Sequence, residues 1–233
     1  MRIFGLCLLF ALSCLSQAAL SQAAWARDEL VTSAVTSGGE TIPYILTAKE
    51  STPAYAVILM PGGKGVLNPR MVDGKLTYAF GGNFLIRSRE LFADGRFVAA
   101  STDATSTPGR ILAIVQDLQR RYGRIAVYVV GTSRSTEATM ALARTLDGKV
   151  AGFIHSSSMN GIAGFDPRGL KSRNLIVLHV RDACRVTSPS SGVASHRKYG
   201  TDLRWMAASP PARTARPTPI TATTASRTKP STR

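Results

Sequence analysis

The chain has 233 residues, of which 44% are hydrophobic, and it carries 29 basic residues against 14 acidic ones. This length and composition allow one buried core, which excludes wholesale disorder, a coiled coil and a small disulfide-rich fold. Only one segment is apolar enough to enter a bilayer, which excludes a polytopic membrane protein. The formal net charge of +15 suggests a nucleic-acid binder until the charges are located along the chain.

The N-terminal segment 1–26 has the pattern of a secretory signal peptide. Arg2 provides the positive start, residues 3–15 form an apolar run too short for a spanning helix, and Ala24-Trp25-Ala26 is an A-x-A cleavage site. Residues 21–23 offer a nearby second site, and an uncleaved membrane anchor is the alternative interpretation. The segment predicts an exported protein, periplasmic or secreted.

Cleavage would remove Cys7 and Cys14 and leave Cys184 as the only thiol, so the mature chain could form no internal disulfide.

The C-terminal segment 207–233 differs in composition from the rest. Thr, Ala, Pro and Ser make up 21 of its 27 residues, Ile220 is its only large apolar residue, and it has five basic residues but no acid. Such a segment cannot bury enough surface to offset its ordering entropy, which predicts a disordered low-complexity tail. The domain between the ends, 27–206, carries a charge near +9, with Arg120-Arg121 as its only basic cluster, so nucleic-acid binding is disfavoured.

Strands and helices are predicted to alternate between the two ends. Apolar runs and turn residues predict strands over 30–36, 42–47, 55–60, 97–101, 125–130, 150–155, 175–180 and 203–206. Helical spacing predicts helices over 83–93, 111–122 and 133–146, the first capped by Asn83 and stopped by Gly95, with Phe84, Leu85, Leu91 and Phe92 on one face. This alternation indicates an α/β fold with a mainly parallel sheet, whose binding crevice lies at the carboxyl ends of the strands.

A nucleophile motif follows one buried strand. Gly131-Thr132-Ser133-Arg134-Ser135 nearly matches G-x-S-x-G, with Ser135 in place of the second glycine. A strand that turns directly into a helix exposes such a serine hydroxyl at the helix N-terminus. The alternative is that Ser133 only caps the helix.

A glycine-rich loop, Pro61-Gly62-Gly63-Lys64-Gly65, follows another buried strand. Acyl transfer needs backbone N–H groups that accept a developing oxyanion, and the predicted donors are Arg134 together with Gly63 or Lys64. A simple turn is the alternative, and the pattern of a phosphate-binding loop is absent.

An acidic residue, Asp182, follows the strand 175–180, where a Ser-Asp-His order would place the carboxylate that orients the base. The alternative is a loop acid paired with Arg181 or Arg185.

Together these segments resemble a bacterial, often exported group of small α/β-hydrolase-fold proteins, mostly uncharacterised. The resemblance covers about residues 30–206 and rests on the elbow 131–134, Pro61-Gly62-Gly63, GNFLIRSR at 82–89 and HVRDACRVT at 179–187. It implies a serine-hydrolase mechanism with Ser133 as nucleophile and Asp182 as the acid, and it names no substrate.

The base of a catalytic triad is missing, since in that group a His follows the last strand and here none follows His196. We interpret His155 as a core or crevice residue and His179 as structural, and His196 lies on a predicted helix before the last strand. The codons of residues 219–226, read in another frame, permit a His-Gly-Phe segment. The hypothesis is a frameshift near residues 205–208, and the alternative is a diverged tail.

The sequence thus predicts an exported esterase-like hydrolase, impaired as written, with a small ester-like substrate. It predicts no cofactor, no metal, no nucleic-acid partner and no membrane contact beyond the signal peptide, and leaves the oligomeric state open. The alternative is a non-catalytic periplasmic binding protein on the same scaffold.

Overall fold

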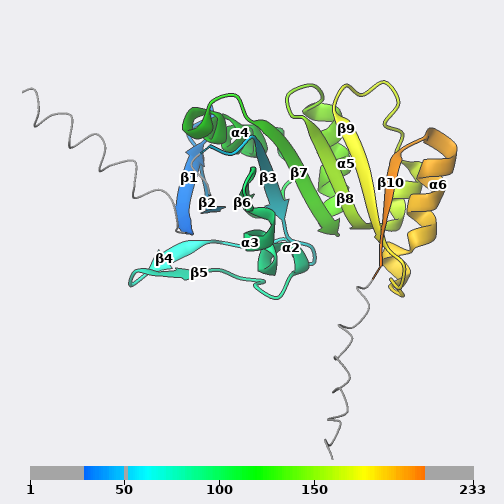
Figure 1. The fold of residues 1–233 in the computed structure, drawn as a ribbon, viewed down its shortest axis with the longest axis horizontal. Coiled ribbons are helices and arrows are strands. Elements are labelled where there is room, and N and C mark those ends of the chain that lie inside the picture. The colour runs from blue at the N-terminus through cyan, green and yellow to red at the C-terminus, as the bar shows by residue number, and fades with distance from the viewer. Residues whose placement is uncertain (1–28, 50–51, 208–233) are drawn as a thin grey trace, which may run out of the picture.

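The computed structural model describes residues 29–49 and 52–207, so the predicted signal peptide and all but the first residue of the predicted tail lie outside it. Strands and helices alternate along this part of the chain (Figure 1). The strands are β1 (Leu30–Val35), β2 (Thr41–Thr47), β3 (Tyr55–Met60), β4 (Arg70–Val72), β5 (Lys75–Thr77), β6 (Phe97–Ser101), β7 (Ala126–Ser133), β8 (Gly152–Ser158), β9 (Arg173–His179) and β10 (Asp202–Met206). The helices are α2 (Phe84–Arg87), α3 (Arg89–Phe92), α4 (Pro108–Tyr122), α5 (Ser135–Thr145) and α6 (Pro189–Tyr199), with short 3₁₀ segments at Asn160–Gly164 and Arg185–Thr187.

One eight-stranded sheet has the order β1-β2-β6-β3-β7-β8-β9-β10. The strands from β6 to β10 in this order are parallel, while β1 pairs with β2, and β2 with β6, in antiparallel fashion. The predicted opening hairpin and mainly parallel sheet are therefore confirmed. The separate β4–β5 hairpin was not predicted from the sequence.

Alternate side chains of the sheet enter two different cores, because successive strand residues point to opposite faces. On one face Ile58 packs with Ile114 of α4 and Leu142 of α5. On the other face Val57 and Leu59 pack beneath α2 and α3. The predicted helices therefore lie on both faces of the sheet.

The predicted helix over 83–93 is wrong in two respects. It is broken at Ser88 into α2 and α3, and Phe84 and Leu91, expected on a buried face, are 50% and 77% exposed. At the break the buried Arg89 folds back, and its Nη1 donates at 2.9 Å to the Ile86 carbonyl, which would accept from the backbone N–H of residue 90 in a continuous helix. Arg89 is also paired bidentately with Glu29, an interaction between distant residues that helical periodicity does not reveal.

Several predicted boundaries shift by a few residues. Strand β7 continues to Ser133 instead of residue 130, and α5 begins at Ser135 instead of Ser133. Strand β8 runs on to Ser158, three residues beyond the predicted end. The predicted nucleophile, Ser133, is therefore the last residue of β7 and stands two residues before the start of α5.

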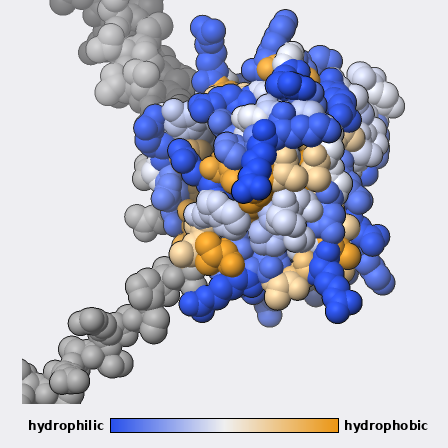
Figure 2. Space-filling model, turned by 90° about the vertical axis from the view of Figure 1, so that its right-hand side faces the viewer, coloured by the Kyte–Doolittle hydropathy of each residue, from blue (hydrophilic) through white to orange (hydrophobic). Residues whose placement is uncertain are grey.

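Half of the sheet lacks a described helix on the α2–α3 side. There the side chains of Ile154, Leu175 and Val177 are only half-buried, and Met206 is exposed. This face of β8, β9 and β10 is turned toward the viewer in Figure 1, with α5 behind it. Two cavities of about 510 and 520 Å³ lie along it, and Ala207, the last described residue, lines the second. Figure 2 shows hydrophobic surface between hydrophilic side chains at this end of the molecule.

Candidate active site

Ser133 lies at the junction of β7 and α5 with a φ of 53°, in the left-handed region. A residue with a Cβ pays on the order of 1–3 kcal/mol for this conformation, so neighbouring contacts must hold it. The hydroxyl of Thr136 donates to the Ser133 carbonyl at 2.6 Å and accepts from the Met159 N–H at 3.0 Å. The half-buried Ser133 side chain is thereby presented at the carboxyl end of the sheet.

Close packing beneath the elbow depends on Gly131 and Ser135. A Cβ on Gly131 would lie 2.7 Å from the Ser135 carbonyl oxygen, so only glycine fits. The buried Ser135 hydroxyl accepts from the Thr132 N–H at 2.8 Å and lies 3.0 Å from the Met60 carbonyl. Ser135 is therefore more than a small substitute for glycine, because it joins the end of β3 to the elbow.

The glycine-rich loop after β3 contacts the elbow directly. A Cβ on Gly62 would lie 2.7 Å from the Thr132 carbonyl oxygen and 3.2 Å from Ser133 Cβ. Gly63 follows with a φ of 62°. The chain beyond this loop is fixed by Asp103, whose Oδ1 accepts from the Asn68 N–H at 2.8 Å. The structure thus brings the loop and Ser133 together.

The predicted oxyanion donors border one cavity. Gly63, Lys64 and Arg134 line a hollow of about 410 Å³, with Ser135 and Glu137 also in its wall. In the described part of the chain, the backbone N–H groups of Gly63, Lys64 and Arg134 make no hydrogen bond. Unused N–H groups beside a nucleophile are the arrangement that can accept negative charge on a carbonyl oxygen.

Asp182 lies in the loop after β9, and its carboxylate holds that loop. Oδ1 accepts from the Cys184 N–H at 3.0 Å, and Oδ2 accepts from the Thr187 hydroxyl at 3.2 Å. Strand β8 separates β9 from the strand that carries Ser133. The structure therefore places Asp182 at the same edge of the sheet as Ser133 but joins the two by no hydrogen bond. The alternative ion pairs with Arg181 or Arg185 are not formed within the described residues either.

His155 is a buried residue of β8, as the core interpretation predicted. Its Nδ1 lies 2.7 Å from Thr139 Oγ1, and its Nε2 lies 3.2 Å from Asn174 Oδ1. The Nδ2 of Asn174 donates to the Ser172 carbonyl, so the Asn174 oxygen faces the His155 ring. Because that oxygen can only accept, His155 Nε2 carries the proton. Burial lowers the pKa of His155 to about 4. With both ring nitrogens engaged in the core, His155 has no position from which to act on Ser133.

The other two histidines also have local partners. His179 ends β9, accepts from the Arg181 N–H at Nδ1 (3.1 Å), and lines the 520 Å³ cavity. His196 lies on α6, as predicted, with Nδ1 2.8 Å from the Thr201 carbonyl. Neither makes a hydrogen bond with Ser133 in the described part of the chain.

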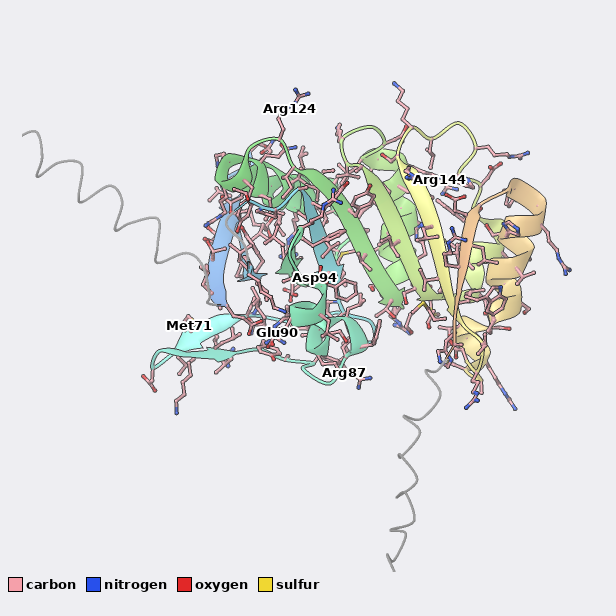
Figure 3. The ribbon with its side chains drawn as sticks, viewed as in Figure 1. Met71, Arg87, Glu90, Asp94, Arg124 and Arg144 are labelled. Carbon is pink, nitrogen blue, oxygen red and sulfur yellow. The ribbon has the colours of Figure 1, made fainter. Side chains whose placement is uncertain are left out.

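Exposed basic side chains occupy both ends of the sheet. Figure 3 shows Arg87 at the end where the parallel strands terminate, and Arg124 and Arg144 at the opposite end. Residues 29–49 and 52–207 contain no cluster of three side chains suited to a metal ion. Their helices are also too short or too polar to cross a bilayer.

No family model matches the sequence, and no curated protein matches it significantly. Solved structures do resemble the fold. A cold-adapted esterase from an Arctic intertidal metagenomic library is 14% identical, with a TM-score of 0.54 over 77% of this chain and 84% of the esterase chain. A lidless α/β serine hydrolase from Xanthomonas campestris is 9% identical, with a TM-score of 0.53 over 77% and 84% of the two chains. A serine hydrolase homologue from Coxiella burnetii is 12% identical, with a TM-score of 0.53 over 78% and 87%.

These structural similarities, together with the strand order, show that the chain has the α/β-hydrolase fold, as its sequence predicted. At such low identity they establish the fold and not an activity.

Proposed function

We propose that this protein is an exported serine hydrolase that attacks small ester-like substrates through Ser133. The observation that carries the proposal is the left-handed conformation of Ser133 between β7 and α5, beside unused N–H groups of Gly63, Lys64 and Arg134. A helix cap alone requires neither that strain nor a second loop packed against the serine. The esterase and serine-hydrolase structures that share the fold add support.

The proposed step forms a bond between Ser133 Oγ and the carbonyl carbon of the ester. The carbonyl electron pair moves onto its oxygen, where the N–H of Arg134 and that of Gly63 or Lys64 accept the charge. The serine proton passes to a base and then to the leaving alcohol. Asp182 is the proposed orienting acid for a base supplied after β10.

The polypeptide as written is expected to be impaired, because none of its described histidines lies against Ser133. Loss of one triad member leaves only the rate enhancement of the oxyanion hole and of binding, roughly 10³–10⁴-fold over water.

Rescue by added imidazole tests this proposal. Imidazole supplies the missing proton acceptor, so hydrolysis of a short p-nitrophenyl ester should rise with imidazole concentration and saturate with ester. Ser133→Ala should show only the hydrolysis that imidazole causes in solution, and a fluorophosphonate probe should label the wild type but not Ser133→Ala. Equal rates for the two proteins, with no labelling, would refute Ser133 as a nucleophile.

We also propose that the reading frame shifts near residues 205–208. The open face of β8–β10, which begins where the described chain ends, supports a missing helical segment there. The tail as written has one large apolar residue, Ile220, so its composition provides little apolar surface that could pack against that face. Sequencing the gene through the codon for Met206 decides the question, and an intact frame with no upstream error would disprove the shift.

We also propose that the protein is exported, on the basis of its N-terminal pattern. Expression in a bacterial host followed by N-terminal sequencing should give a mature chain that begins at Arg27. A chain retained in the membrane fraction with its first 26 residues would favour the anchor instead.

The second candidate function is non-catalytic binding in the periplasm. The apolar cavity of about 520 Å³ on the open face favours it, because such a hollow can hold a ligand without any chemistry at Ser133. Absence of imidazole rescue, together with salt-sensitive retention of the protein on an anionic matrix, would support this candidate.

A further inference from the structure

In the Asn83 side-chain amide the oxygen accepts a hydrogen bond, while the nitrogen makes none with the described residues. Its Oδ1 accepts from the Leu85 N–H at 3.1 Å and caps α2. This bond fixes the amide orientation, so Nδ2 points away from the helix. Within the described residues Nδ2 donates to no acceptor. From the sequence only a capping role was predicted for Asn83, and that role uses the oxygen of its amide but not the nitrogen.

The unused end of Asn83 lies beside the nucleophile. The position that a Cβ on Gly62 would occupy is 3.6 Å from Asn83 Nδ2 and 3.2 Å from Ser133 Cβ. The amide and the serine thus both lie within 4 Å of the point that a side chain on residue 62 would occupy, and the absence of that side chain leaves space next to both. Asn83 is half-buried, so water only partly competes for its N–H groups.

The backbone of Asn83 is held on both sides. Its N–H donates to the Phe80 carbonyl at 2.8 Å, and its own carbonyl accepts from the Arg87 N–H at 2.9 Å. With its backbone and Oδ1 all engaged, the amide has few alternative positions. A donor fixed before the reaction costs no reorganisation when charge develops.

We propose that Asn83 Nδ2 donates a third hydrogen bond to the oxyanion that forms when Ser133 attacks an ester, a role that rests on the proposed hydrolase function. A tetrahedral oxyanion has three lone pairs. The peptide N–H groups of Arg134 and of Gly63 or Lys64 take two of them, and the Asn83 amide takes the third. The bond strengthens as the carbonyl oxygen becomes negative, so it lowers the barrier more than it favours ester binding.

Two substitutions separate this role from capping. Asn83→Asp and Asn83→Ser both retain an oxygen for the Leu85 N–H and both are good N-caps, but neither presents an N–H toward Ser133. Imidazole-rescued hydrolysis of a p-nitrophenyl ester should fall roughly 10²–10³-fold in kcat for both, with KM and thermal stability unchanged. Asn68→Asp is the matched control, because it makes the same chemical change on an exposed side chain with no contact to Ser133 among the described residues, and it should keep the wild-type rate.

The outcomes distinguish the two proposals. If Asn83→Asp and Asn83→Ser keep the wild-type kcat while Ser133→Ala is inactive, the role of Asn83 is overturned. The hydrolase proposal would then still stand. A raised KM with unchanged kcat would also overturn it, since that result indicates a contact with the bound ester only. No rescue or labelling of the wild type would overturn the hydrolase and the Asn83 role together.

Discussion

Single residues decide whether the elbow can form. Gly62 lets the loop after β3 touch Ser133, and Gly131 lets α5 pass close to β7. His155, at the same level of the sheet as Gly131, is committed to the core by its two hydrogen bonds. Each of these features has a measurable consequence.

Gly62→Ala should abolish most reactivity of Ser133. The new methyl group would lie 2.7 Å from the Thr132 carbonyl oxygen, which is backbone and cannot move aside without shifting the elbow. We expect fluorophosphonate labelling to slow at least 10²-fold, comparable to the loss of an oxyanion donor. Gly82→Ala is the control, because nothing lies within 4 Å of its added Cβ. Equal labelling of the two variants would contradict the packing argument.

His155 should make stability fall in mild acid. Its folded-state pKa of about 4 lies below the ordinary 6.5, so between these values the unfolded chain binds the proton and the folded chain does not. The free energy of unfolding should therefore decrease as the pH falls from 6.5 to 4, by about 3 kcal/mol in total. Urea unfolding at several pH values measures this slope, and His155→Gln should remove it. A slope unchanged by that substitution would show that other groups cause it.

At the scale of elements, a buried polar network fixes α4 against the first two strands. The Tyr44 hydroxyl on β2 donates to Asp117 on α4, which also accepts from Arg120 and Arg121. Arg121 in turn donates to Thr32 on β1 at 2.7 Å. Burial raises the pKa of Asp117, but hydrogen bonds from Tyr44 and Arg121 outweigh it and the pKa is lowered. The network thus keeps a buried carboxylate charged between two elements.

Tyr44→Phe should destabilise the fold by about 2 kcal/mol, the contribution of a hydrogen bond to a charged group. Tyr122→Phe is the matched control, since the Tyr122 hydroxyl makes no hydrogen bond in the described part of the chain. Chemical denaturation of both variants gives the difference. Equal losses would mean that ring packing, and not the bond to Asp117, carries the effect.

At the scale of the whole molecule, the described helices cover the two faces of the sheet unequally. Helices α4, α5 and α6 cover one face from end to end, while α2 and α3 cover only the part near β3 and β6 on the other. Two valines on strands either side of β8 show this difference in cover, because Val129 on β7 is fully buried and Val177 on β9 is half-exposed.

Val129→Ala should therefore lower the free energy of unfolding by about 2 kcal/mol or more, and Val177→Ala should lower it by less than about 1 kcal/mol. In a chain whose last codons are translated in the alternative frame, the cost of Val177→Ala should rise toward that of Val129→Ala, because a covering segment would then bury the side chain. Urea denaturation of the three variants and of their two unsubstituted parent chains tests this. If Val177→Ala still lowers the free energy of unfolding by less than about 1 kcal/mol in the alternative-frame chain, no segment of that chain covers the face.

The continuous apolar run at 55–60 predicted β3 to the residue, because buried parallel strands need apolar side chains on both faces, and the predicted strand 97–101 matches β6. The same pattern located β7, β8 and β9 with errors at their ends. Helix 83–93 was mispredicted because Arg89 is buried through a bond to Glu29, 60 residues away. The hairpin β4–β5 was missed because each strand has only three residues, and these do not alternate between buried apolar and exposed polar side chains.

The sequence by itself determined the alternation of strands and helices, the glycine loop and the serine between β7 and α5, since these depend on local hydrophobic pattern and on residues that tolerate tight turns. Only the tertiary structure decided which groups meet. It placed Gly62 and the Asn83 amide beside Ser133, committed His155 to the core, and left one half of the sheet uncovered by any helix within residues 29–49 and 52–207. These outcomes depend on contacts between residues far apart in the chain, and no local pattern encodes them.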